Sequence, residues 1–392
     1  MRIPLPSRPA IDGRRRNVRR WSALALCAAA GACFAQPPYE VVRVDGDLPE
    51  GSEYFGNAIG PDGHVVGTYI EPTDEYTFGF RWRDGDVVEL PSFAGGSTPS
   101  PGLQVIPKAV NATGVVVGDL RFDGFPNEAF WYSAPTFVSG AFRWTPPDLR
   151  AVNGLSENGR VGGSAVFTEG PLVATQAVAW TLPATTDGIA TDVRQLGRFV
   201  GDGILESQAI GVSPSGEYVV GQARRSVGAP AGARWNLSTG VTSPEMFMPP
   251  SAAVSSELVD VNDQGFAAGT FRNPTRSGIY IVGRTAAEVF EFPGLGGSSA
   301  AAAAIDAAGN IVGFAADAQE ISRAVITDGD VLVDLRTRLL HRWRNYTMSE
   351  ATDINDRGEI LVQACCGTSC GVAVLRPALH SNDFETDSGC GP

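Results

Sequence analysis

The sequence predicts an all-β fold: a seven-bladed β-propeller of four-stranded antiparallel blades. A short motif of an apolar residue, a tight turn and a glycine occurs seven times, and successive copies lie 44 to 57 residues apart. Each copy begins a series of short strands. Four short strands in a repeat of this length are typical of a propeller blade. The seven turn glycines are Gly63, Gly114, Gly159, Gly216, Gly265, Gly309 and Gly358.

The first 35 residues are predicted to be a secretion signal. Arginines at positions 14 to 20 form a basic region, and Ala23 to Ala32 is a short apolar run before Cys33-Phe34-Ala35. Small residues at these positions suit a signal peptidase, so we predict cleavage before Gln36. A lipoprotein signal ending at Cys33 would lack its usual leucine. The run is too short to span a membrane, and the protein is expected in the periplasm or outside the cell, with no membrane span.

The chain is strongly acidic. Its net charge is −13, and removing the first 35 residues leaves 23 basic and 42 acidic residues, a net charge of −19. Such a charge repels nucleic acid and anionic lipid, so neither is expected as a partner. We expect a monomer without a cofactor.

Each repeat is predicted to open with a strand, a tight turn and a second strand. Short polar residues start most of the turns, because their side chains can bond the backbone two residues further on. The glycine then supplies the positive φ that closes the hairpin. The turn-start residues are Gly60, Asn111, Ser156, Ser213, Asn262, Asp306 and Asn355, and the apolar column before them is Ile59, Val110, Leu155, Val212, Val261, Ile305 and Ile354.

Two further strands complete most repeats. Third strands are expected at 78–82, 140–144, 177–180, 231–235, 279–282 and 323–326, and the tryptophans that end four of them (Trp82, Trp144, Trp180 and Trp235) are expected to pack between blades. Fourth strands are expected at 86–90, 192–196, 288–292 and 331–335. The seventh repeat lacks a fourth strand, whereas an unassigned strand at 39–51 precedes the first repeat. Closing a ring removes exposed sheet edges, so this N-terminal strand is predicted to complete the last blade. The predicted domains are a signal peptide (1–35), the propeller (36–377) and a C-terminal tail (378–392).

The repeat resembles the HAF repeat of probable extracellular bacterial proteins. The best match is FEFPGLGGSSAAAAAIDAAGNIVG at 290–313, and the resemblance covers about residues 40 to 377. The His-Ala-Phe tripeptide itself is absent, and the nearest segments are 141–144 and 129–131, so the chain would be a divergent member. The resemblance implies a secreted propeller-like protein and supplies no catalytic residue.

Four cysteines remain after signal removal, all within the last 28 residues: Cys365, Cys366, Cys370 and Cys390. An even number in an exported protein predicts disulfides. Two pairings are sensible, either 365–370 with 366–390 or 365–390 with 366–370. A zinc site is the alternative, but no metal is expected.

A ligand site is predicted on the face opposite the glycine turns, where the connections between strands are long and varied. Aromatic and charged residues there suit a glycan or a protein; Asp74 and Asp123 are further candidates. The predicted ligand-binding residues are Tyr69, Glu71, Asp119, Arg121, Trp131, Tyr132, Arg224 and Arg225. Asp260 and Asp353, just before the apolar column, either point into the channel as acids or accept hydrogen bonds from a neighbouring turn, and we favour the second role.

Three functions follow from these patterns. The leading hypothesis is a secreted, non-catalytic module that binds a polysaccharide or a surface protein through its variable loops. The three histidines lie near no recognised catalytic or metal-binding pattern, yet a glycoside hydrolase or polysaccharide lyase using loop carboxylates is the second hypothesis. Two acids on different blades with perturbed pKa values would favour it. The third is a structural surface or matrix component.

Overall fold

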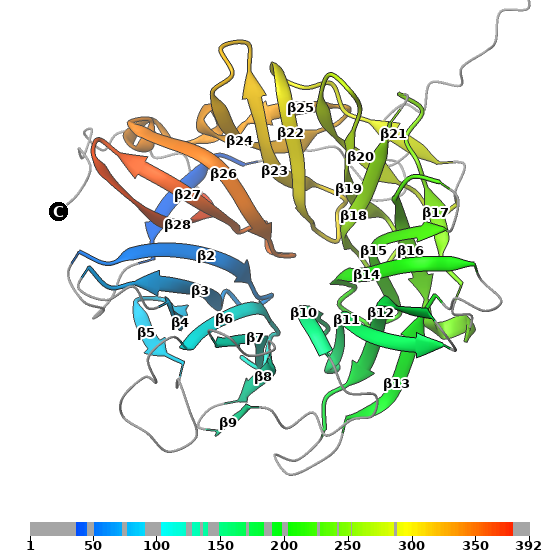
Figure 1. Cartoon of the computed structure of the whole chain (residues 1–392). Coiled ribbons are helices and arrows are strands. Elements are labelled where there is room, and N and C mark those ends of the chain that lie inside the picture. Colours follow the sequence, from blue (N-terminus) through cyan, green and yellow to red (C-terminus); the bar gives the residue numbers. More distant parts are fainter. Residues whose placement is uncertain are drawn as a thin grey trace, which may run out of the picture. The chain divides into compact units, whose positions relative to one another are not determined.

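The computed structural model describes residues 37–44, 51–72, 77–90, 103–122, 128–133, 136–139, 149–169, 172–183, 190–197, 203–225, 228–240, 243–251, 253–285 and 288–378. The chain separates into two units, Met1–Phe34 and Ala35–Pro392, and every described residue belongs to the second. These residues form seven antiparallel sheets of four strands each, which confirms the predicted seven-bladed propeller (Figure 1).

The first four blades follow the chain in order. Blade one holds β2 (Glu53–Ile59), β3 (Val65–Ile70), β4 (Thr77–Arg83) and β5 (Asp86–Glu89). Blade two holds β6 (Leu103–Val110), β7 (Val116–Phe122), β8 (Glu128–Ser133) and β9 (Thr136–Ser139). Blade three holds β10 (Leu149–Leu155), β11 (Arg160–Glu169), β12 (Leu172–Thr181) and β13 (Thr191–Leu196). Blade four holds β14 (Ile204–Val212), β15 (Tyr218–Arg225), β16 (Ala231–Asn236) and β17 (Glu245–Phe247).

The last three blades continue the pattern. Blade five holds β18 (Ser255–Val261), β19 (Ala267–Arg272), β20 (Ser277–Val282) and β21 (Val289–Glu291). Blade six holds β22 (Gly296–Ile305), β23 (Ile311–Asp317), β24 (Ser322–Asp328) and β25 (Val331–Asp334). Blade seven holds β26 (Tyr346–Ile354), β27 (Ile360–Cys366), β28 (Ser369–Pro377) and β1 (Tyr39–Arg43). Short 3₁₀ turns are η1 (Leu237–Thr239), η2 (Leu335–Arg338) and η3 (His341–Trp343).

The N-terminal strand closes the propeller, as predicted. β1 is the outermost strand of blade seven and pairs antiparallel with β28, with Tyr39 opposite Pro377 and Arg43 opposite Ala373. In Figure 1 the blue β1 lies against the red β28. The segment between blades six and seven holds β1 from its other side, because the Leu340 amide donates to the Tyr39 carbonyl at 3.0 Å. Tyr39, Val41 and Leu339 are buried there in one core cluster.

All seven predicted glycine turns are present and lie between the first and second strands of their blades. Every turn glycine has a positive φ between 73° and 89°, a region that a side chain disfavours. The glycine amide donates to the carbonyl of the turn-start residue, as in Gly114 to Asn111 at 2.9 Å. The Asn111 Oδ1 also accepts from the Thr113 and Val115 amides. We call the end of the propeller with these turns the turn face and the opposite end the loop face.

A β-bulge occurs in the innermost strand of every blade. The pairing register between the first and second strands shifts by one residue at Asn57, Lys108, Asn153, Ile210, Val259, Ala303 and Thr352. A bulge adds one unpaired residue and turns a side chain away from the regular pleat. In blades one to six a glycine of the second strand faces the bulge. In blade seven Val362 takes this position.

These second-strand glycines are needed because the backbone approaches them closely. At Gly221, an added Cβ would overlap the Gln208 carbonyl and lie 3.1 Å from the Ala209 Cα. We expect Gly221→Ala to lower the free energy of unfolding by about 3 kcal/mol, since the backbone must move to admit the methyl group. Gly371→Ala is the control, because no atom lies within 4 Å of its added Cβ. Urea denaturation of both variants measures the difference, and equal stabilities would contradict the steric explanation.

The predicted third strand of blade two is wrong. The segment 140–144 was assigned to it by analogy with the other tryptophan-ended strands, but the sheet uses β8 and β9 as its third and fourth strands. The part of the chain from 119 to 139 contains the end of β7 and both of these strands. Residues 140–144, with Trp144, lie outside the described part. Trp82, Trp180 and Trp235 are buried in the core, as predicted.

One predicted disulfide is present. Cys365 and Cys370 lie opposite each other in the β27–β28 hairpin and are bonded, with their Cα atoms 4.0 Å apart. This rules out the pairing of Cys365 with Cys390. Cys366 is also disulfide-bonded, and its partner lies outside the described residues. The disulfide joins β27 to β28, the strand that pairs with the closing strand β1.

Candidate functional site: the central cavity

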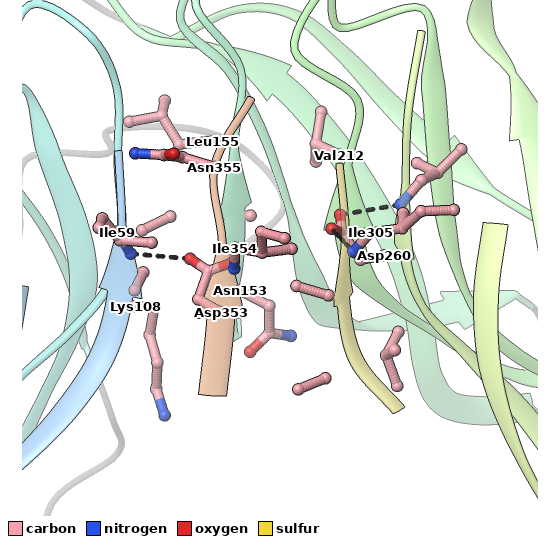
Figure 2. Close-up of a pocket in the computed structure, with 18 of the residues that line it drawn as sticks. Ile59, Lys108, Asn153, Leu155, Val212, Asp260, Ile305, Asp353, Ile354 and Asn355 are labelled. Carbon is pink, nitrogen blue, oxygen red and sulfur yellow. Dashed lines mark hydrogen bonds between the residues drawn. The ribbon is translucent and has the colours of Figure 1, made fainter. Parts of the chain in front are cut away.

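The innermost strands of all seven blades line one central cavity of about 430 Å³ (Figure 2). Its lining includes the seven bulge residues and the residues that follow them toward the glycine turns. Pro61, Glu157, Pro214 and Asp356 belong to the turns themselves, so the cavity lies toward the turn face. The predicted ligand site lies at the loop face, and none of these bulge residues was among its candidates. In the sequence, the bulge residues form a column two positions before the apolar residue that precedes each turn.

Asp260 and Asp353 line this cavity and join neighbouring blades. Asp353 Oδ2 accepts from the Ile59 amide of blade one at 2.8 Å, and Oδ1 accepts from the Ile354 amide. Asp260 makes the same pair of bonds, from Ile305 of blade six at 2.9 Å and from Val261. Both hydrogen bonds between blades are drawn in Figure 2. The donors are strand residues directly before a turn, so these acids do accept hydrogen bonds, and they also face the cavity.

Burial perturbs both carboxyl groups. Loss of solvent raises the pKa of Asp260 to about 7, against the effect of the Ile305 and Val261 amides. Burial also raises the pKa of Asp353 to about 7, and the charge of Asp260 adds to the increase. A buried carboxylate loses its hydration, and a second negative charge nearby disfavours ionisation further. The two acids therefore interact across blades five and seven.

The turn-face mouth carries two more acids that are tied to backbone amides. Glu157 Oε2 accepts from the Ala112 amide of blade two at 2.9 Å, and Asp356 Oδ1 accepts from the Ala307 amide of blade six at 2.8 Å. Burial raises the pKa of Glu157, and the nearby Asp62 and Asp356 charges add to the rise. These carboxylates hold successive turns together.

Most of the eight predicted ligand-binding residues lie in or beside strands, and none lines the central cavity. Tyr69, Trp131 and Tyr132 are buried in blades one and two. The Tyr69 hydroxyl donates to Glu89 at 2.7 Å, and burial raises the pKa of Tyr69 well above its usual range. The Arg81 guanidinium lies 5.5 Å from the centre of the Tyr132 ring. These aromatic rings pack inside the protein, and contact with a ligand would require them to move.

The charged candidates have varied surroundings. Asp119 is buried and accepts from the Val152 amide of blade three at 2.9 Å, and burial raises its pKa. Arg224 pairs with Glu206 at 2.9 Å. Glu71 is half-buried, whereas Arg121 and Arg225 are exposed. Asp74 and Asp123 lie outside the described residues. Ligand binding by this set stays a prediction.

Most of the exposed large apolar side chains lie toward the loop face. Eight large apolar side chains of the described residues are exposed. Five of them lie near strand ends or in connections on the loop face, whereas Val331 follows a turn on the other face and Val88 and Val193 lie on outer strands. The five come from several blades: Phe55, Val173, Met248, Val254 and Ile321.

Two features are absent from the described ranges, a membrane-spanning helix and a metal-binding cluster. No helix there has both the length and the apolar composition to cross a membrane. No group of three or more His, Cys, Asp and Glu side chains in the same ranges is arranged to hold a metal ion.

Solved structures similar to this chain are propellers or contain one, and the chain is therefore a β-propeller protein. A prolyl endopeptidase matches with a TM-score of 0.51 and 11% identity over 92% of this chain and 53% of its own. A puromycin-hydrolysing peptidase of Mycobacterium tuberculosis matches with a TM-score of 0.50, 15% identity and coverages of 88% and 57%. Prolyl oligopeptidase B of Galerina marginata matches with a TM-score of 0.50 and 8% identity over 80% of this chain and 47% of its own.

This chain spans about half the length of these peptidases. At such low identity the likeness concerns the fold alone. No family model and no curated protein matches the chain.

Proposed function

We propose that this chain is an exported, non-catalytic binding module that holds a protein partner on its loop face. The observation that carries the proposal is that five of the eight exposed large apolar side chains of the described residues lie on that face. Protein interfaces use apolar anchors inside a polar rim, and Phe55, Val254 and Ile321 supply such anchors on blades one, five and six. The signal-like N-terminus and the Cys365–Cys370 disulfide support export, since disulfides persist in oxidising compartments.

A protein suits this face better than a glycan. Sugar recognition relies on exposed aromatic rings, but Tyr69, Trp131 and Tyr132 are buried. Aliphatic groups such as Val254 and Ile321 cover apolar protein surface more readily than they stack on a sugar ring. The resemblance to HAF-repeat proteins agrees with a secreted role and remains part of the proposal.

The test is retention of extracellular proteins of the producing bacterium on the immobilised chain. We expect the triple variant Phe55→Ser, Val254→Asp and Ile321→Asp to lose at least about tenfold in affinity for the retained partner, because central apolar anchors dominate such interfaces. Val331→Asp is the matched control, since Val331 is equally exposed but follows a turn on the other face. Equal retention by the triple variant and the wild type would overturn the proposal.

The same preparation is incubated with bacterial and plant polysaccharides. Retention of a polysaccharide without sugar release would show that the partner is a glycan and not a protein. Retention of neither class of polymer would favour a structural surface or matrix component.

Catalysis is the second candidate, and one observation favours it. Asp260 and Asp353 come from different blades and have pKa values raised to about 7, a property common in acid–base catalysis. Both oxygens of each carboxyl, however, accept backbone hydrogen bonds, and one of the two bonds at each carboxyl joins neighbouring blades. Released sugar that disappears in Asp353→Asn would support an enzyme. No release from any polymer would support the binding module.

A further inference from the structure

The seven bulge side chains divide the cavity wall into two sides. All seven occupy the same backbone position in their blades and all are half-buried. Blades four, five and six supply only apolar groups, whereas blades seven, one, two and three supply only polar groups. Consecutive blades are neighbours, so each set forms one continuous side. The apolar residues are Ile210, Val259 and Ala303, and the polar residues are Thr352, Asn57, Lys108 and Asn153.

The backbone repeat does not require this division. The same bulge forms opposite a glycine in six blades and opposite Val362 in the seventh, and it admits Ala303 and Lys108 alike. Binding pockets for small molecules combine apolar walls with a few placed polar groups, in volumes of about 300–1,000 Å³. The cavity volume of about 430 Å³ lies in this range.

Lys108 is the distinctive polar group of the cavity. It is the sole lysine in the whole sequence. Its ammonium forms no ion pair or hydrogen bond with any residue in the described ranges. Figure 2 draws its side chain extended, with the ammonium at the end away from Asn355 and the turn. Both oxygens of Asp260 and of Asp353 already accept amide hydrogens. Lys108 is the one cation among the residues that line the cavity, and its charge also acts on Asp119 of β7.

Two asparagines flank Lys108 on the neighbouring blades. Asn57 Nδ2 donates to the Pro107 carbonyl of blade two, and Asn153 Nδ2 donates to the Ala209 carbonyl of blade four, both at 2.7 Å. These bonds fix the side-chain amides and use one of the two Nδ2 hydrogens of each, so the second hydrogen can donate to a ligand. The four carboxyl groups around the cavity disfavour a ligand with two or more negative charges.

We propose that the central cavity binds a small monocarboxylate with an apolar body. The carboxylate lies against Lys108, and the body packs on Ile210, Val259 and Ala303. This site is separate from the loop face, so the partner-binding proposal and this one can fail independently.

The test is calorimetric titration of the secreted protein with matched probes at pH 6. The probes are 3-phenylpropanoate and octanoate, with 3-phenylpropanol and 3-phenylpropylamine as neutral and cationic counterparts. We expect both carboxylates to bind, and at least about tenfold more tightly than the alcohol or the amine, since each tenfold in affinity needs about 1.4 kcal/mol. No heat from either carboxylate up to about 10 mM, or tighter binding of the amine, would overturn the proposal.

Variants then locate the site. Lys108→Met keeps the length of the side chain and removes its charge, and we expect it to weaken carboxylate binding about tenfold without changing binding of the alcohol. Val259→Thr conserves the shape of the side chain but adds a hydroxyl group. It should lower the affinity for every probe, because each probe packs an apolar body on this side of the cavity. Arg272→Met, which removes an exposed cation at the loop-face end of β19, is the control and should bind as the wild type does. Thermal melting confirms that each variant is folded, and a folded Lys108→Met protein with unchanged carboxylate affinity contradicts the assignment.

Discussion

Removal of residues 37–44 is expected to lower the melting temperature of the propeller by about 6 °C or more. This segment contains β1, whose Tyr39 and Val41 are buried in the blade-seven core, and Val44, which is buried between blades seven and one. Burying one such side chain stabilises a protein by about 1.5–3 kcal/mol, so the three together contribute about 4.5–9 kcal/mol. With an unfolding entropy of about 2.1 cal/mol/K per residue, each kcal/mol shifts the melting temperature of a propeller of roughly 340 residues by about 1.4 °C. The loss also exposes the edge of β28.

Calorimetry of the shortened and complete proteins measures this effect. Arg43→Ser is the control, since Arg43 lies on β1 but is exposed, and its melting temperature should stay within about 1 °C of the wild type. A shortened protein that melts at the wild-type temperature would show that β1 contributes little to closing the propeller.

Raising the pH from about 4.5 to 8.5 is expected to lower the free energy of unfolding. Burial raises the pKa values of Asp260 and Asp353 from 3.8 to about 7. A group whose pKa is higher in the folded state stabilises the fold fully below its unfolded pKa, and this stabilisation is lost as the pH rises through the folded value. A shift of one unit corresponds to about 1.4 kcal/mol, so each carboxyl accounts for up to about 4 kcal/mol. Asp119, Asp306 and Glu350, whose pKa values burial also raises, act in the same direction.

Asparagine variants separate these acids from the others. Asp260→Asn with Asp353→Asn removes both ionisations and keeps one acceptor oxygen at each site, so the decline in stability between pH 5 and 8 should become shallower. Asp84→Asn is the control, because the Arg376 side chain holds the pKa of the exposed Asp84 below its usual value and outside this interval. Urea denaturation at several pH values gives the slopes. A wild-type stability that rises from pH 5 to 8, or an unchanged slope in the double variant, would contradict the explanation.

The sequence predicts the architecture well because each blade carries its own local signals. A glycine such as Gly114 and a turn-start residue such as Asn111 specify a hairpin through contacts a few residues apart. Blade two was misassigned because residues 140–144 resemble the tryptophan-ended strands of other blades, whereas its real third strand ends in Tyr132-Ser133. Pattern similarity cannot decide between two adjacent segments that both fit.

The cavity was harder to predict than the fold. The bulge that turns Lys108 and its equivalents toward the axis results from a backbone register shift, and no residue type marks such a shift by itself. The second-strand glycines indicate this register shift indirectly, since Gly118 faces the bulge of its blade. The burial of Tyr69 and Trp131 could not be predicted either, because the alternation of apolar and polar residues along one strand does not show which blade covers it. Asp353 was recognised as a hydrogen-bond acceptor, but its partner, Ile59, lies on the first blade.

The pairing of Tyr39 with Pro377 makes closure of the propeller depend on the presence of all seven repeats. β1 is the first strand of the propeller along the chain and β28 is the last, so the ring can close only when every repeat between them is present. Contacts between such distant segments form late and slowly. A chain that stops early keeps an unpaired strand at its N-terminus and lacks the edge that would receive it. Unpaired strand edges of this kind make an incomplete chain prone to aggregation.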